Sequence, residues 1–207
     1  MVPRALAEAA RPRVEGEREE EILDAVVEML VENGYDRLTM DAVAKRARAS
    51  KATLYRRWQT KSSLVVDAVI RAKSMNAQPL PDTGSLRGDL RAMFCTNMVT
   101  TSETTSVLGV VVTALQTDPE FAADFRSRFL RPKTQASEEI YRRAAERGEL
   151  APGVDASLIG PAFAGILLHR RFLLGEEITP DLVDRVLDQI ILPAATGVPC
   201  NAVQESS

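Results

Sequence analysis

Apolar side chains recur three and four residues apart along most of this chain of 207 residues, and no long stretch alternates with a period of two. Such spacing places the apolar side chains on one face of a helix, whereas a strand would require alternation. In residues 17–33, for example, Ile22, Val26 and Leu30 share one face. No stretch approaches the ~20 apolar residues of a membrane-spanning helix. The pattern therefore predicts an all-α fold and no membrane partner.

Capping residues and prolines divide this pattern into separate helices. Thr39 and Ser50 suit the N-caps of two short helices. Pro119, Pro132 and Pro180 suit the first turns of three others. The expected helices are 17–33, two short helices between 39 and 58, about 62–75, 85–101, 105–117, 119–130, 132–147, 155–175 and 180–192.

One stretch marks a domain boundary. Residues 77–85, AQPLPDTGS, contain two prolines and a glycine. We expect an N-terminal three-helix bundle at 17–75 and a larger helical domain at 76–197. Residues 1–16 and 198–207 are expected to form a flexible arm and a flexible tail.

Charge is distributed unevenly along the chain. The formal net charge is −3, yet residues 37–73 contain ten Lys or Arg against two Asp, a local balance of +8. From residue 76 onward, twelve basic and seventeen acidic residues give −5. Binding of a polyanion depends on the local field, so residues 37–73 are a candidate nucleic-acid site. The alternative is a solvated charged face.

Residues 39–58 have the layout of a helix-turn-helix: a short helix, the turn Arg48-Ala49-Ser50, and a second short helix. At 100° per residue, Leu54 and Trp58 fall on one face of the second helix and are expected to point into the bundle. Ala52 and Arg56 fall on the opposite face. The second helix is therefore expected to lie in the major groove of DNA.

The outward face combines a small residue, a guanidinium that can bind guanine through two hydrogen bonds, and hydroxyls that reach phosphates or base edges. Ser50 and Lys51 stand at the start of this helix and Lys61 near the start of the next, where phosphate contacts are expected. The alternative is a three-helix bundle that binds nothing. The expected DNA-contacting residues are Thr39, Arg48, Ser50, Lys51, Ala52, Thr53, Tyr55, Arg56, Arg57 and Lys61.

Residues 38–64, LTMDAVAKRARASKATLYRRWQTKSSL, resemble the DNA-binding signature of the tetracycline-repressor (TetR) family of bacterial regulators. The resemblance is close over about 17–75 and extends to the remainder only through the number and length of its helices. It implies nine or ten helices, a homodimer and a ligand pocket in the C-terminal domain. The matching positions are Thr39, Val43, Ala44, Ala47, Ser50, Thr53, Leu54, Tyr55, Trp58, Lys61 and Leu64.

Two residues of the turn depart from this signature. Arg48 replaces the usual glycine and Ala49 the valine that usually follows it. Glycine is the residue that most easily takes a positive φ. We therefore expect Arg48 to accept a modest backbone strain or, alternatively, to add a DNA contact.

A ligand pocket is expected where residues 93–102, MFCTNMVTTS, mix apolar and polar side chains on consecutive helical turns. Apolar cavities with a few polar groups suit small organic ligands. The alternative is an ordinary hydrophobic core. The expected ligand-binding residues are Met93, Phe94, Asn97, Met98, Thr101, Leu108, Val111, Leu115, Phe125, Phe129 and Tyr141.

Two C-terminal helices are expected to form a four-helix dimer interface with a second copy. Residues 155–175 and 180–192 both have wide apolar faces, and Gly160 and Gly165 would allow close helix approach. The alternative is that both helices complete the core of the monomer. The expected interface residues are Ile159, Phe163, Ile166, Leu167, Val183, Leu187 and Ile191.

The sequence carries no motif for catalysis, for a cofactor or for a metal. The single histidine, His169, has no catalytic partner implied by spacing, and Cys95 and Cys200 are far apart. We expect no enzyme, no cofactor, no metal, and reduced thiols in a cytoplasmic protein.

These features predict a transcriptional regulator, most simply a repressor. Its expected partners are double-stranded DNA with a palindromic operator, a small and mostly apolar effector that releases the DNA, and a second copy of the chain. The alternative is a helical ligand carrier or scaffold that does not bind DNA.

Overall fold

A computed structural model describes residues 15–72, 79–98 and 102–197; within these ranges the side chains of residues 15, 96–98, 102–106 and 108 are not described. In the described ranges every regular element is helical, and the elements form nine continuous helical segments. This confirms the all-α prediction. Residues 1–14 of the predicted arm and the predicted tail at 198–207 lie outside the described residues.

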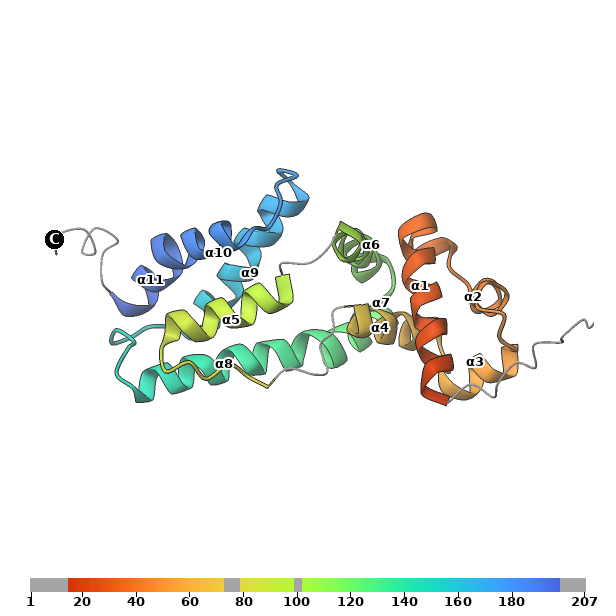
Figure 1. Ribbon diagram of the computed structural model, residues 1–207, viewed down its shortest axis with the longest axis horizontal. Helices are drawn as coiled ribbons and strands as arrows, with labels where there is room; N and C mark the ends of the chain where they lie inside the picture. The colour runs from red at the N-terminus through yellow and green to blue at the C-terminus, as the bar shows by residue number, and fades with distance from the viewer. Residues whose placement is uncertain (1–14, 73–78, 99–101, 198–207) are drawn as a thin grey trace, which may run out of the picture.

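The N-terminal bundle lies at one end of an elongated molecule (Figure 1). Its long helix α1 carries a local break at Gly34, whose φ is 77°. The buried faces of α1 and α4 meet around Val26, Leu30 and Leu64, each 0% exposed. The four helices are α1 (Glu15–Arg37), α2 (Met40–Arg46), α3 (Lys51–Arg57) and α4 (Lys61–Ala72).

The two predicted caps of the helix-turn-helix are present. The Thr39 hydroxyl accepts a hydrogen bond from the backbone N–H of Ala42 at 3.2 Å. The Ser50 hydroxyl accepts one from the N–H of Thr53 at 3.0 Å. Each cap satisfies a backbone donor that the first turn of a helix leaves unpaired.

The remaining helices divide between two hydrophobic clusters. Helices α6 and α7, with the π-helical turn η1 (Arg126–Leu130) that follows α7, pack against α1 and α4 and extend the core of the N-terminal bundle. Helices α5, α8, α9, α10 and α11 enclose a second cluster. Their bounds are α5 (Leu86–Met98), α6 (Ser102–Thr117), α7 (Pro119–Phe125), α8 (Arg131–Glu146), α9 (Ala156–Phe172), α10 (Pro180–Val186) and α11 (Leu192–Thr196).

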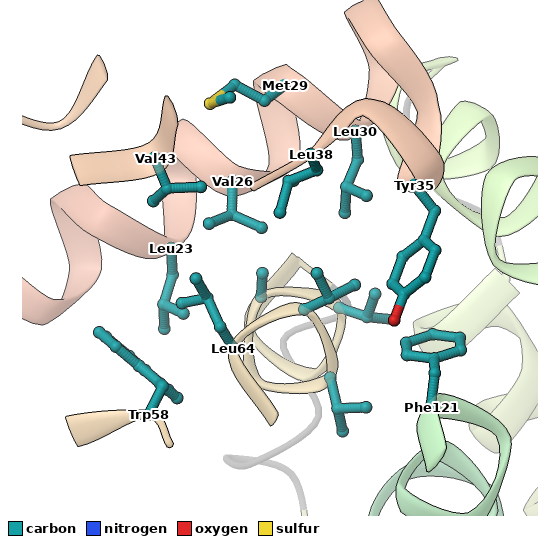
Figure 2. Packing of buried hydrophobic residues seen from close by; sticks show 14 of the residues in the cluster. Leu23, Val26, Met29, Leu30, Tyr35, Leu38, Val43, Trp58, Leu64 and Phe121 are labelled. Atoms are coloured by element: carbon teal, nitrogen blue, oxygen red, sulfur yellow. The ribbon is translucent and has the colours of Figure 1, made fainter. Parts of the chain in front are cut away.

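Aromatic side chains join the N-terminal bundle to α7. The Tyr35 ring lies 4.8 Å from that of Phe121 between ring centroids, and Figure 2 shows the two side by side at the edge of the bundle core. The Tyr35 hydroxyl donates a hydrogen bond to Asp118 at 2.7 Å. The core of the N-terminal bundle therefore continues past residues 77–85 into the C-terminal part of the chain.

One helix start predicted from a proline, that at Pro132, is wrong because the helix does not restart there; α7 and α10 do begin at Pro119 and Pro180. Helices α7 and α8 are continuous through η1 (Arg126–Leu130), and α10 and α11 through a second π turn, η2 (Leu187–Ile191). The N–H of Arg131 bonds to the carbonyl five residues back, as does that of Leu192. Pro132 and Pro193 directly follow these two residues. Proline lacks an N–H and crowds the carbonyl four residues back, and the wider π turn accommodates it without ending the helix.

Candidate DNA-binding surface

Helix α3 presents the face that its sequence predicts. Leu54 is 0% exposed and Trp58, its C-cap, is 1% exposed. Ala52 and Arg56 are exposed on the opposite side, and Tyr55 beside them is 50% exposed. The exposed face of α3 therefore carries a small side chain, a phenol and a guanidinium. It lies at the end of the molecule far from α11 (Figure 1).

The C-terminal end of α3 is anchored by Trp58. Its backbone N–H bonds to the carbonyl of Leu54 at 2.8 Å. Its indole N–H donates to the Asp67 carboxylate on α4 at 2.7 Å. A buried indole with a satisfied N–H fixes both the depth and the rotation of the segment that carries it.

The turn between α2 and α3 adopts the left-handed conformation without a glycine. Arg48 has φ 51°, so this residue accepts the positive φ, as the first of the two expectations for it stated. The N–H of Ala49 bonds to the Ala44 carbonyl at 2.9 Å and that of Arg48 to the Lys45 carbonyl at 3.3 Å. This is the Schellman arrangement, in which glycine is the usual left-handed residue. Helix α8 ends in the same way, with Gly148 at that position and a φ of 76°.

Arg18, which the sequence analysis did not single out, supports this turn from α1. One guanidinium nitrogen donates to the carbonyls of Ala47 and Arg48, each at 2.7 Å. The same side chain forms an ion pair with Glu21 at 2.5 Å. Two carbonyls at the end of α2 are therefore satisfied by a cation, which also suits the negative end of the helix dipole.

Acidic side chains of α1 neutralise part of the positive charge counted in residues 37–73. Arg46 pairs with Glu28 and Glu32, and the hydrogen bond from Arg46 lowers the pKa of Glu32. Arg71 pairs with Glu20 and Asp24 at 3.2 and 2.9 Å. The charge balance of residues 37–73 alone does not reveal this pairing, because the acidic partners lie in α1, before that segment.

Three basic residues predicted to contact DNA have partners within the protein. Arg57 pairs with Glu19 on α1 at 2.8 Å. Lys51 pairs with Asp41 at 2.7 Å. The Lys61 ammonium lies 3.9 Å from the centroid of the Tyr35 ring. Their roles at DNA stay predictions, since a phosphate would have to compete with these partners or share the cation with them.

The described residues of the predicted ligand site fall into two groups. Four belong to the core shared with the N-terminal bundle and three to the second cluster. Asn97, Met98 and Leu108 have undescribed side chains, and Thr101 lies outside the described residues. The first group is Val111, Leu115, Phe125 and Phe129, and the second is Met93, Phe94 and Tyr141.

The described apolar side chains of α6, α7 and η1 pack toward α1 and α4, so the described members of the two groups lie in separate clusters. In the second group, Phe94 packs on Phe163 of α9 with ring centroids 3.9 Å apart. The hydroxyl of Tyr141 is buried and has no hydrogen-bond partner among the described residues. Burial raises the pKa of Tyr141 to about 12.

Most of the predicted dimer-interface residues lie in the core of the single chain, which corrects the sequence expectation. Five are at most 1% exposed, and Ile159 and Ile166 are partly buried. A wide apolar helix face predicts burial but not whether the same chain or a second one provides it. The five buried residues are Phe163, Leu167, Val183, Leu187 and Ile191.

A different face of α9 is exposed. Leu158, Gly165, Leu168 and Phe172 follow one another at helical spacing on this face, and a Cβ built on Gly165 would meet no atom within 4 Å. Leu158 is 69% exposed and Leu168 is 38% exposed. This stripe is therefore one apolar surface that a partner could cover.

Within the described ranges, no helix is long and apolar enough to cross a membrane. The same ranges contain no group of three or more His, Cys, Asp or Glu side chains that could hold a metal ion.

The fold and the α2–α3 unit together define a helix-turn-helix DNA-binding protein. Residues 22–68 match the family described as bacterial regulatory proteins, tetR family, and residues 80–190 match the tetracyclin repressor-like C-terminal domain. The chain belongs to the TetR family and is a DNA-binding transcriptional regulator.

Relatives and a solved structure agree with this assignment over nearly the whole chain. The HTH-type transcriptional regulator YdeS of Bacillus subtilis is 30% identical over 198 residues, covering 95% of this chain and 96% of YdeS. The DNA-binding transcriptional repressor TetR of Mycobacteroides abscessus is 30% identical over 172 residues, covering 83% and 90%. The crystal structure of the TetR family transcription regulator SCO0332 is 29% identical, with a TM-score of 0.62 and coverage of 84% and 97%.

Replacing Arg48 with glycine should stabilise the protein, because glycine takes a positive φ without steric cost. We expect Arg48→Gly to be more stable than Arg48→Ala by about 1 kcal/mol, since alanine removes the same side chain but keeps the strain. Urea denaturation of both variants measures the difference. Equal stabilities of the two variants would contradict a strained turn at Arg48.

Proposed function

We propose that the protein is a dimeric repressor whose two α3 helices read the half-sites of a palindromic operator in adjacent major grooves. The observation that carries this proposal is the outward face of α3, with Ala52, Tyr55 and Arg56 exposed on the side opposite the buried Leu54. A helix that places its small residue outward lets its backbone approach the base edges, and a guanidinium can bind guanine through two hydrogen bonds.

Repression is the sign of regulation that we propose, because a relative covering 83% of this chain is a DNA-binding transcriptional repressor. A protein with two-fold symmetry needs two equivalent half-sites, which accounts for the palindrome. Genomic DNA selected with the purified protein would supply the operator for the measurements below.

Arg56→Ala should weaken operator binding by about 1–3 kcal/mol and relax the base preference at one position in each half-site. Arg185→Ala is a matched control, because it removes the same charge from an exposed position on α10. Fluorescence anisotropy with the operator and with single-base variants measures both effects. Parent-like affinity and base preference in Arg56→Ala would contradict the assignment of α3.

The second copy is proposed to pack on the exposed stripe of α9. Support comes from the apolar side chains of this stripe and from the open space at Gly165, where a second helix could approach closely. Two copies would then bury the same patch against each other, as two-fold symmetry requires. The buried face of α9, by contrast, packs against Phe94 within the chain.

Substitutions at two adjacent leucines of α9 distinguish a loss of dimer formation from a loss of folding. Leu168→Asp should leave the chain folded and convert the dimer to a monomer, because Leu168 is exposed in the single chain. Leu167→Asp should unfold the chain, because Leu167 is 0% exposed and the carboxylate of the introduced aspartate would be buried without a partner. Light scattering and circular dichroism measure the two outcomes. A monomeric parent, or a Leu168→Asp variant that stays dimeric, would contradict this interface.

We further propose that a small, mostly apolar effector binds among α5, α8 and α9. The buried Tyr141 hydroxyl without a partner supports this, since an unpaired buried polar group is costly and a ligand atom could pair with it. Phe94 and Phe163 supply aromatic surface in the same cluster. A thousandfold loss of DNA affinity requires about 4 kcal/mol of differential binding between the two conformations.

A screen of small organic molecules against the full-length protein tests the effector proposal. Compounds that bind this cluster should raise the melting temperature of the parent and release operator DNA, and a compound that hydrogen-bonds to Tyr141 should act more weakly on Tyr141→Phe. Release of DNA that is unaffected by Tyr141→Phe, for every active compound, would contradict a site at this hydroxyl.

A further inference from the structure

The Asp67 carboxylate of α4 contacts both the residue that ends α3 and a residue from the C-terminal part of the chain. One carboxylate oxygen accepts the indole N–H of Trp58, directly after α3, at 2.7 Å. The other forms an ion pair with Arg128 of η1. The Asp67 side chain is only 14% exposed. Each oxygen of one largely buried carboxylate therefore has its own partner, from a different part of the chain.

Both contacts of the Asp67 carboxylate are strong polar interactions. A carboxylate accepts charge-assisted hydrogen bonds, which are shorter and stronger than neutral ones, and low exposure to water strengthens them further. Removal of Arg128 would leave the carboxylate without its counter-charge, which is costly at a largely buried position. The Trp58–Asp67 hydrogen bond is thus coupled to the presence of a side chain that lies outside the N-terminal bundle.

The position of Arg128 depends on the π turn. Arg128 lies in the middle of η1, and its guanidinium is also held by Ser63 at 3.3 Å and Asp124 at 3.4 Å. A π turn contains more residues than an α turn, so the conversion of η1 to regular helix would change the direction of Arg128 relative to α8. The contact with Asp67 therefore couples the geometry of this turn to α4.

We propose that Arg128 is a positioning residue for DNA recognition. From the C-terminal part of the chain it holds Asp67, and through Asp67 it holds the indole of Trp58, so that α3 keeps one orientation relative to α4 and α7. Arg128 itself touches no DNA in this account. The proposal rests on DNA reading by α3 and goes beyond it by naming the residue that orients α3.

Trp58 is the only tryptophan in the chain, so the protein has a single indole N–H to observe by nuclear magnetic resonance. In full-length Arg128→Met, the indole N–H resonance should shift, and binding to the selected operator should weaken about tenfold, or about 1.4 kcal/mol. Arg126→Met is the matched control, because it removes the same charge from an exposed position of the same turn. The control should change neither the resonance nor the affinity.

A double-mutant cycle tests whether Arg128 acts through Asp67. Asp67→Asn combined with Arg128→Met should lose no more affinity than the more impaired of the two single variants. Arg128→Lys, which keeps a cation, should recover part of the loss. If Asp67→Asn does not fold, the indole shift and the Arg128→Lys recovery carry the test alone.

A merely structural Arg128 would give a different result. Arg128→Met would then have a lower melting temperature, yet its folded fraction would bind the operator like the parent and its indole resonance would not move. That result, or additive losses in the double variant, would overturn the proposal. Failure of DNA reading by α3 is distinguishable, because Arg56→Ala would then also bind like the parent.

Discussion

Packing of α1 and α4 against α6 and α7 is the constraint on which the rest of the molecule depends. A column of aromatic rings runs through this contact, with centroid separations of 4.8, 5.8 and 4.6 Å. Phe121, which lies between Tyr35 and Phe125, is 0% exposed. A lysine lies at each end, Lys61 over the Tyr35 ring and Lys133 over that of Phe129, and burial lowers the pKa of Lys133 to about 8. The rings are Tyr35, Phe121, Phe125 and Phe129.

This shared core makes the DNA-binding bundle part of a larger unit. Because side chains on both sides of residues 77–85 fill one core, a change in the angle between α4 and α7 would cost packing as well as polar contacts. Polar contacts also hold these helices together, among them the hydrogen bond from Tyr35 to Asp118 and the ion pair of Arg128 with Asp67. Among the described residues, an effector in the second cluster would have a path to α3 through α8 and the π turn, because these join that cluster to the shared core.

Helix caps and inward-facing residues could be predicted from the sequence, because nearby residues determine them. Which of two apolar helix faces is covered could not be predicted, because distant helices determine it. Ser50 as a cap and Trp58 as an inward residue follow from spacing within a few residues, and the structure confirms both. On α9 the sequence could not separate Leu167 from Leu168, because both lie on apolar stretches and only the neighbouring helices decide which is covered. Pro132 suggested a helix start, since the sequence carries no signal for a π turn. The acidic face of α1 was overlooked because its partners are remote in sequence.

Urea unfolding followed separately at Trp58 and by circular dichroism is the most direct test of the shared core. Phe121→Ala should destabilise the protein by about 3–5 kcal/mol, and the Trp58 transition should move together with the loss of helix, although Phe121 lies outside the N-terminal bundle. Val112→Ala, a truncation at a 51% exposed position of α6, should leave both transitions nearly unchanged. A Trp58 transition that keeps its parental midpoint in Phe121→Ala while the remaining helix signal unfolds earlier would contradict the account.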